Sequence, residues 1–155
     1  MNFIQKTAAC CVAFAVLAVP GVAQAGPVDD AEALRKLDIM LMVTSLRCRT
    51  TKDDFQADYR RFSSNNLAAL NAAARTLKAD MVRKTGSRNA KRALDKMSVN
   101  MANQYGNGHP WLGCGELKQI ARDLSQGSST VQLSAAADEL LSNRPRGQWA
   151  MASAR

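Results

Sequence analysis

The segment from Leu34 to Cys48 reads LRKLDIMLMVTSLRC and carries apolar residues on nearly every side of the helix that it predicts. A surface helix has one apolar stripe, whereas a helix that is apolar all round is buried. We therefore expect this segment to be the central helix of the fold. Asp29 and Asp30 precede it and should stabilise its N-terminus, because carboxylates there accept hydrogen bonds from free amides and face the positive end of the helix dipole.

Residues 1–25 have the pattern of an export signal. Lys6 is followed by an apolar run at residues 8–19 and by an Ala-Gln-Ala sequence that ends at Ala25 and fits the small-x-small cleavage rule. The apolar run is too short to anchor a chain stably in a bilayer. We expect a signal peptide that is cut after Ala25 and a periplasmic or secreted mature chain with no transmembrane segment.

Cleavage after Ala25 removes 25 of the 155 residues and one cation, Lys6, which leaves 130 residues and a formal net charge of +7 instead of +8. It also leaves two of the four cysteines, Cys48 and Cys114. An exported chain meets an oxidising compartment, so a disulfide between these two is expected. Closing that loop should stabilise the domain by about 4 kcal/mol on the chain-entropy model.

The apolar residues after the central segment recur at steps of three and four, and no segment alternates as a strand would. The sequence therefore predicts an all-α domain at residues 26–142, a small antiparallel bundle of four to six helices with one disulfide. Polar residues 63–66, SSNN, should kink or break the second helix. The expected later helices run from Lys52, after a Thr51 cap, to Lys84; from a Ser87 cap to Tyr105; from Cys114 to Ser125; and from a capping box at Ser129 to about Ser142.

Residues 143–155 contain three arginines and no acidic residue. Pro145 and Gly147 argue against a continuing helix. We expect this segment to be a basic, flexible tail.

The predicted topology places Cys48 and Cys114 at one end of the bundle, together with polar and aromatic residues that are typical of binding loops. Arginines there can meet an anion, and an aromatic ring can stack on a ligand. The alternative is structural, with Trp111 closing the bundle end, His109 capping a helix and the arginines complementing a helix dipole. The ligand-binding candidates are Arg47, Arg49, Asn103, Gln104, Tyr105, His109 and Trp111.

A basic patch flanks the turn between the second and third predicted helices, at the end opposite the disulfide. Such a cluster can hold anionic wall polymers, lipid headgroups or nucleic acid, although it can also be only a solvated face. The patch consists of Arg83, Lys84, Arg88, Lys91 and Arg92.

Catalytic residues are weakly indicated. Glu116 and His109 are candidates for general acid–base chemistry, which needs a shifted pKa and a second placed group. A glutamate in the first turn of a helix is also expected on dipole grounds alone. One histidine and two paired cysteines make no zinc site, and no nucleotide-binding motif occurs, so we expect no cofactor and no metal. Met97 and Met101 could face copper(I), but their place on an apolar stripe favours core packing.

Two stretches carry a family resemblance, LDIMLMVTSLRCRTTKDDFQADYRRF and MANQYGNGHPWLGCGELK. They resemble a group of short exported bacterial helical proteins of unknown function, which sometimes carry the label S-adenosyl-L-homocysteine hydrolase. That enzyme is a much larger two-domain NAD-binding protein, whereas this chain has no Rossmann fingerprint and no room for the domain. The resemblance therefore implies export and a helical fold, and no catalytic residue.

These observations predict a non-enzymatic binding or structural protein of the cell envelope. The expected partner is an anionic envelope component or a protein, and export argues against a physiological nucleic-acid partner. The alternative function is a small cell-wall hydrolase that uses Glu116 and His109.

Overall fold

The computed structural model describes residues 26–142, and this part of the chain forms six helices and no strand. The predicted all-α fold is therefore confirmed, and the expected signal peptide and tail lie outside the described residues. The helices are α1 (Pro27–Cys48), α2 (Gln56–Asn65), α3 (Leu67–Thr85), α4 (Ser87–Gln104), α5 (Cys114–Leu124) and α6 (Thr130–Leu141).

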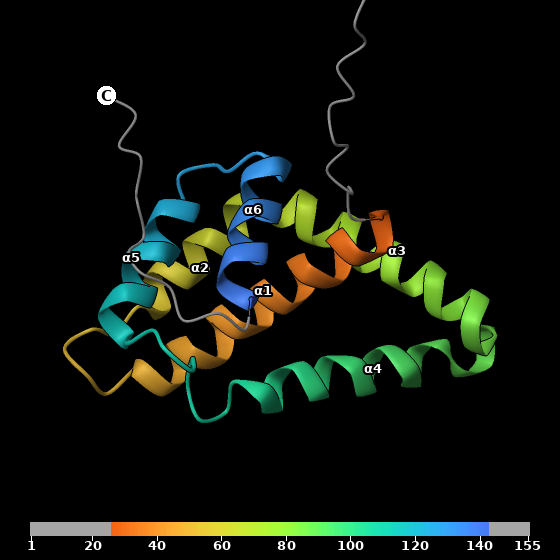
Figure 1. Cartoon of the computed structure of the whole chain (residues 1–155), viewed down its shortest axis with the longest axis horizontal. Coiled ribbons are helices and arrows are strands. Elements are labelled where there is room, and N and C mark those ends of the chain that lie inside the picture. The colour runs from red at the N-terminus through yellow and green to blue at the C-terminus, as the bar shows by residue number, and fades with distance from the viewer. Residues whose placement is uncertain (1–25, 143–155) are drawn as a thin grey trace, which may run out of the picture.

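Helix α1 is the centre of the bundle and packs against all five other described helices (Figure 1). Leu37, Met40 and Leu41 on α1 have no exposed surface. The predicted central helix is confirmed. It is not buried on every side, because Met42 and Leu46 remain 37% and 47% exposed.

The N-terminus of α1 differs from the prediction. The helix begins at Pro27, so Asp29 and Asp30 lie within its first turn and do not precede it. Proline suits this position because its φ is already helical and it lacks an N–H that would go unbonded. The backbone N–H of Gly26 donates to the Asp29 carboxylate at 3.3 Å, so the expected stabilisation by carboxylates holds.

Several polar side chains are buried on α1, and each has a hydrogen-bond partner. The Tyr59 hydroxyl donates to Asp38 at 3.1 Å, and burial raises the pKa of Asp38 despite this bond. The hydroxyls of Thr44 and Ser45 donate to carbonyls of the preceding turn at 2.7 and 2.8 Å. These bonds offset the cost of placing polar atoms in the core.

The Cys48–Cys114 disulfide is present and joins the last residue of α1 to the first residue of α5, with the two Cα atoms 5.8 Å apart. Cys48 is buried. The bond fixes the loop between α4 and α5 at the end of α1.

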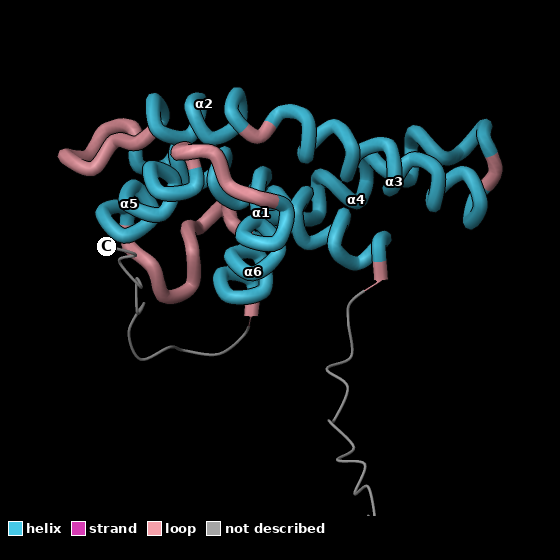
Figure 2. The backbone as a smooth tube through the Cα atoms, turned by 90° about the horizontal axis from the view of Figure 1, so that it is seen from above, coloured by secondary structure: helices cyan, strands magenta, loops and turns pink. Residues whose placement is uncertain are grey.

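The predicted break at residues 63–66 is confirmed, since α2 ends at Asn65 and α3 begins at Leu67 (Figure 2). The Asn66 side-chain amide donates to the carbonyls of Phe62 and Leu124, at 2.9 and 3.0 Å. The Asn65 amide donates to the Ser125 carbonyl at 2.6 Å. The two asparagines therefore bind the carbonyls at the end of α5 that have no partner within the helix.

The predicted start of the second helix is wrong. Thr51 does not cap it, because the Thr51 hydroxyl donates to the Cys48 carbonyl at 2.8 Å and so completes the end of α1. Helix α2 begins only at Gln56, whose N–H donates to the Asp54 carboxylate at 2.9 Å. The intervening residues are needed to reverse the chain after α1.

Helices α3 and α4 form a hairpin whose turn lies far from α5 and α6 in both views (Figures 1 and 2). Gly86 makes this turn with a φ of 77°, a backbone conformation that favours glycine. Gly86 is also the residue that precedes α4, so Ser87 is inside the helix and makes no capping bond, contrary to the prediction. Ala90 and Met101 on α4 are buried, as is Tyr105 directly after the helix, so the expected core packing of Met101 is confirmed.

The capping box predicted at Ser129 is confirmed. The Ser129 N–H donates to the Gln132 side chain at 2.8 Å, and the Gln132 N–H donates to the Ser129 hydroxyl at 3.3 Å. Helix α6 lies against α1 and covers its core face with Leu133, Ala137 and Leu140.

We expect Leu41→Ala to lower the free energy of unfolding by about 2 to 5 kcal/mol, because it removes a fully buried side chain from the central helix. Urea denaturation measures this loss. Leu46→Ala is the matched control on the same helix, where the half-exposed side chain should cost less than about 1 kcal/mol. Equal costs at the two positions would contradict the central packing of α1.

Candidate functional site

His109 lies in the loop between α4 and α5, and both of its ring nitrogens are bonded. Nε2 donates to the Leu140 carbonyl in the last turn of α6 at 2.9 Å, because a carbonyl can only accept. Nδ1 accepts from the backbone N–H groups of Trp111 and Leu112, at 3.4 and 3.2 Å. His109 therefore caps the end of α6 and fixes the loop, which is the structural role considered in the sequence analysis.

Two aromatic rings flank His109. Tyr105 stacks on the imidazole with ring centroids 6.1 Å apart, and Trp111 meets it edge-on at 4.9 Å. Tyr105 is buried, whereas Trp111 is half-buried. These rings protect the His109 hydrogen bonds from water, so most of the aromatic surface at this end is used inside the protein.

A small pocket of about 180 Å³ lies beside the disulfide, with Arg47, Asn107 and His109 in its lining. The Arg47 side chain lies over Gly108, and a Cβ atom at Gly108 would be 3.3 Å from Arg47 Nε. Gly108 has a φ of 101°, so glycine is favoured there for two reasons. The pocket is smaller than the 300 Å³ or more typical of small-molecule sites.

The structure separates the remaining candidates for this end. Arg49 and Asn103 are exposed and do not line the small pocket. Gln104 lines a different groove, described below. Of the seven predicted ligand-binding residues, Arg47 and His109 line this small pocket together.

Glu116 is placed by its own helix. Its carboxylate accepts a hydrogen bond from the Gly113 N–H at 2.8 Å, across the first turn of α5. This is the N-terminal role expected of a glutamate at that position. Glu116 is exposed, and its charge opposes the lowering of the His109 pKa that burial causes.

The predicted basic patch occupies the tip of the α3–α4 hairpin, far from the disulfide (Figure 1). Arg83 and Lys84 are both paired with Asp80, at 3.0 and 2.7 Å. The hydrogen bond from Lys84 lowers the pKa of Asp80, and the same contact raises the pKa of Lys84. The sequence analysis did not foresee this carboxylate, which lies one turn before the two cations on α3.

The other three cations of the patch differ from this pair. Arg88, Lys91 and Arg92 are exposed and form no ion pair within residues 26–142. They lie in the first two turns of α4, where no acidic residue occupies the first turn. The dipole favours anions in the first turn of a helix, so Arg88, which lies there, does not stabilise α4.

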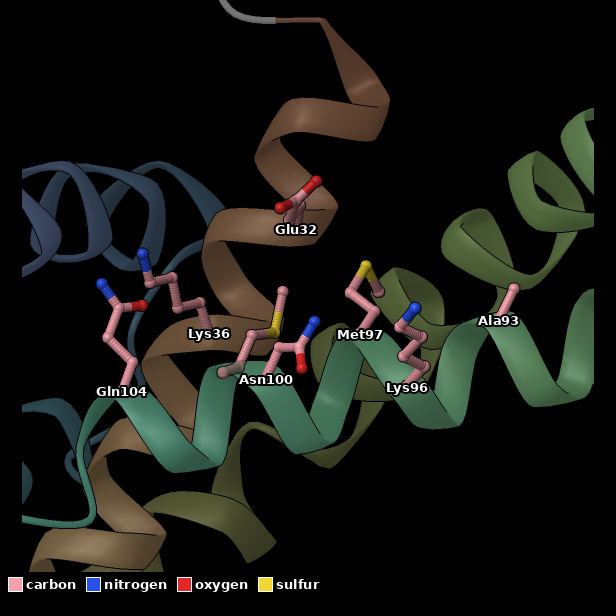
Figure 3. A pocket seen from close by; sticks show the side chains of 8 residues that line it. Glu32, Lys36, Ala93, Lys96, Met97, Asn100 and Gln104 are labelled. Carbon is pink, nitrogen blue, oxygen red and sulfur yellow. The ribbon is translucent and has the colours of Figure 1, made fainter.

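A groove of about 430 Å³ lies between α1 and α4 (Figure 3). Glu32 and Lys36 reach it from α1, while Lys96, Asn100 and Gln104 reach it from α4. In Figure 3, Lys36 and Gln104 lie at one end of the groove and Ala93 at the other, with Lys96 and Met97 between them. The rest of the lining is apolar and consists of Ala93, Met97 and Met101.

The sequence analysis missed this groove, apart from Gln104 and the two methionines. Its α4 residues recur at steps of three and four, and Glu32 and Lys36 are four apart, so each set shares one helix face. The spacing was visible, but nothing in the sequence indicated that these two faces adjoin. The two faces adjoin because α4 crosses α1 in the folded structure.

A further groove of about 500 Å³ lies between α1, α3 and α6, and five of its eleven lining residues are alanines. Asp30 is its one charged residue. Thr76, Thr130 and Ser134 add hydroxyl groups, but no cation lines this groove.

None of the helices within residues 26–142 has the length and hydropathy needed to cross a membrane. No three histidine, cysteine, aspartate or glutamate side chains gather into a metal-binding group among the described residues. Searches found no match to this chain among protein-family models, curated proteins or solved structures.

We expect acid to destabilise the protein through His109. Burial lowers the pKa of His109 below 6.5 in the folded state, so between that pKa and 6.5 the unfolded chain binds more protons. The contribution of neutral His109 to the free energy of unfolding is fully present above about pH 6.5. It is lost as the pH falls through the folded-state pKa of His109. Protonation also places an N–H at Nδ1, opposite the two N–H groups that it accepts.

Urea denaturation between pH 5 and 8 measures this dependence. His109→Gln is the reference, because it removes this titration and leaves all other ionisable groups in place. The wild type should lose more stability on acidification than the variant does. Parallel pH profiles of the two proteins would contradict the role given to His109.

Proposed function

We propose that this protein is a non-enzymatic, exported protein that binds an anionic surface of the cell envelope through the tip of the α3–α4 hairpin. The observation that carries the proposal is the cluster of Arg88, Lys91 and Arg92. These side chains are exposed, have no ion-pair partner in the described structure and lie at the helix end where the dipole disfavours cations.

Such a placement costs local stability, so an external anion is the interaction that best accounts for it. The hairpin turn is also the part of the bundle farthest from α5 and α6, which lets it approach a flat surface without contact from the rest of the domain (Figure 1). Phosphate groups of lipids are the anions that an envelope surface presents most densely. Each basic residue near such a surface contributes about 1 kcal/mol of attraction.

A hydrolase is less well supported. Glu116 bonds the start of its own helix, and both ring nitrogens of His109 are bonded to backbone groups. General acid–base chemistry needs two groups that are free to exchange protons with a substrate. No specific observation in the described structure favours a second function.

We expect the purified protein to bind vesicles that contain phosphatidylglycerol and not vesicles of phosphatidylcholine alone. The triple variant R88Q/K91Q/R92Q should bind about 100-fold more weakly, because three attractions of about 1 kcal/mol are lost. Co-sedimentation with vesicles measures this, and binding should weaken with added salt because the attraction is screened.

The matched control is R49Q/K52Q/R60Q, which removes the same charge from exposed residues outside the hairpin. It should lose much less affinity. If both triple variants lose affinity equally, the protein responds to net charge alone and the hairpin is not the site. If the hairpin variant binds like the wild type, the proposed function is wrong.

Export has its own test. When expressed with residues 1–25, the chain should be recovered outside the cytoplasm with an intact mass that starts at Gly26. The mass should be that of the chain less two hydrogens, with no thiol alkylated under denaturing conditions, because Cys48 and Cys114 are bonded. A retained chain that keeps its leader and has free thiols would contradict the proposed location.

A further inference from the structure

We propose that the groove between α1 and α4 is a binding site for a small organic acid, with a carboxylate headgroup and an aliphatic body. This site is distinct from the surface of the proposed function, because it lies along the part of α4 beyond the hairpin tip (Figure 3). Its volume of about 430 Å³ is in the range of small-molecule sites.

The polar lining of the groove is not used inside the protein. Lys36, Lys96, Asn100 and Gln104 form no hydrogen bond or ion pair with another side chain within residues 26–142. Two ammonium groups and two amides are therefore free to donate to a ligand. These donors line one groove, and an acid headgroup can replace the water that otherwise solvates them.

The charge of the lining selects an anion. Two lysines face one carboxylate, Glu32, so the groove has an excess of positive charge. Glu32 also interacts electrostatically with Lys84 on α3. A ligand with one negative charge neutralises this excess, whereas a compact group with several negative charges would be repelled by the Glu32 carboxylate.

The apolar lining selects a ligand with an aliphatic body. Met97 is half-buried and Met101 is buried, and both border the groove together with Ala93. Methionine side chains are flexible and polarizable, and they adapt to apolar ligands of varied shape. The groove thus offers apolar surface beside its ammonium groups, as an organic acid with a hydrocarbon chain requires.

The same two methionines were considered above as copper(I) ligands. Their thioethers do border an open groove, but Lys36 and Lys96 border it too. Two ammonium groups repel a metal cation, and the lining of the groove supplies no third soft ligand beside the two methionines. The groove therefore favours an organic anion over a metal.

Octanoate is the probe for this site. We would label the methionine methyl groups of the full mature domain with ¹³C, assign them by single Met→Leu substitutions, and titrate with octanoate. The Met97 and Met101 signals should shift, and that of Met81, which does not line the groove, should stay in place. The variant K36Q/K96Q should bind at least about tenfold more weakly, because its lining no longer offers a charged donor to the carboxylate.

Two further measurements test each half of the proposal. Octyltrimethylammonium has the same chain with the opposite charge and should bind far more weakly than octanoate. Asn100→Trp keeps the charges and fills the groove from an exposed position, so it should block octanoate. Binding of both amphiphiles with equal affinity, unchanged binding to N100W, or no shift of Met97 and Met101 at millimolar octanoate would each overturn the proposal.

The outcome is separable from that of the proposed function. R88Q/K91Q/R92Q should keep octanoate binding, and K36Q/K96Q should keep most of its vesicle binding. If inorganic phosphate alone reproduces the methyl shifts, the groove binds anions whether or not they carry an aliphatic chain. The aliphatic part of the proposal is then wrong.

Discussion

The burial of α1 is the constraint on which the rest of the structure depends. One helix makes contact with the five others that the structure describes, so all of them share one apolar centre, although α4 packs mainly on α3 and α2 packs mainly on α5. Burying a side chain of the size of leucine contributes roughly 1.5 to 3 kcal/mol, which makes α1 the largest apolar contribution of any single helix. The disulfide then fixes the end of α1 to the start of α5 and lowers the conformational entropy of the unfolded chain.

Side-chain amides and the histidine complete this arrangement by bonding the ends of helices. Asn65 and Asn66 bond carbonyls at the end of α5, and His109 bonds a carbonyl at the end of α6. In the sequence, His109 has the properties of a binding or catalytic residue, since it is the sole histidine and stands in a polar loop. Its role in the structure is set in part by a backbone carbonyl that lies 31 residues away in the chain.

Because the core uses these groups, the side chains that are left for recognition lie elsewhere, on α4 and the face of α1 beside it. Helix α4 packs mainly on α3 and α1 and leaves much of its surface open. Its first turns carry the cations that helix stability does not explain, and its later turns carry the free donors and methionines of the groove. Both proposals therefore place recognition on the least enclosed helix of the bundle.

The sequence by itself determined the helical class, the central helix, the break before α3, the disulfide pair and the capping box of α6. Each depends on local periodicity, on polar residues within a few positions, or on there being one pair of cysteines. The pairing of Asp80 with Arg83 and Lys84 was also readable, because these residues are three and four apart on one helix. The start of α2, the role of His109 and the groove between α1 and α4 were decided by the folded structure. Most of these depend on which side chains and backbone groups come together when helices pack, and the helical period alone does not specify how one helix crosses another.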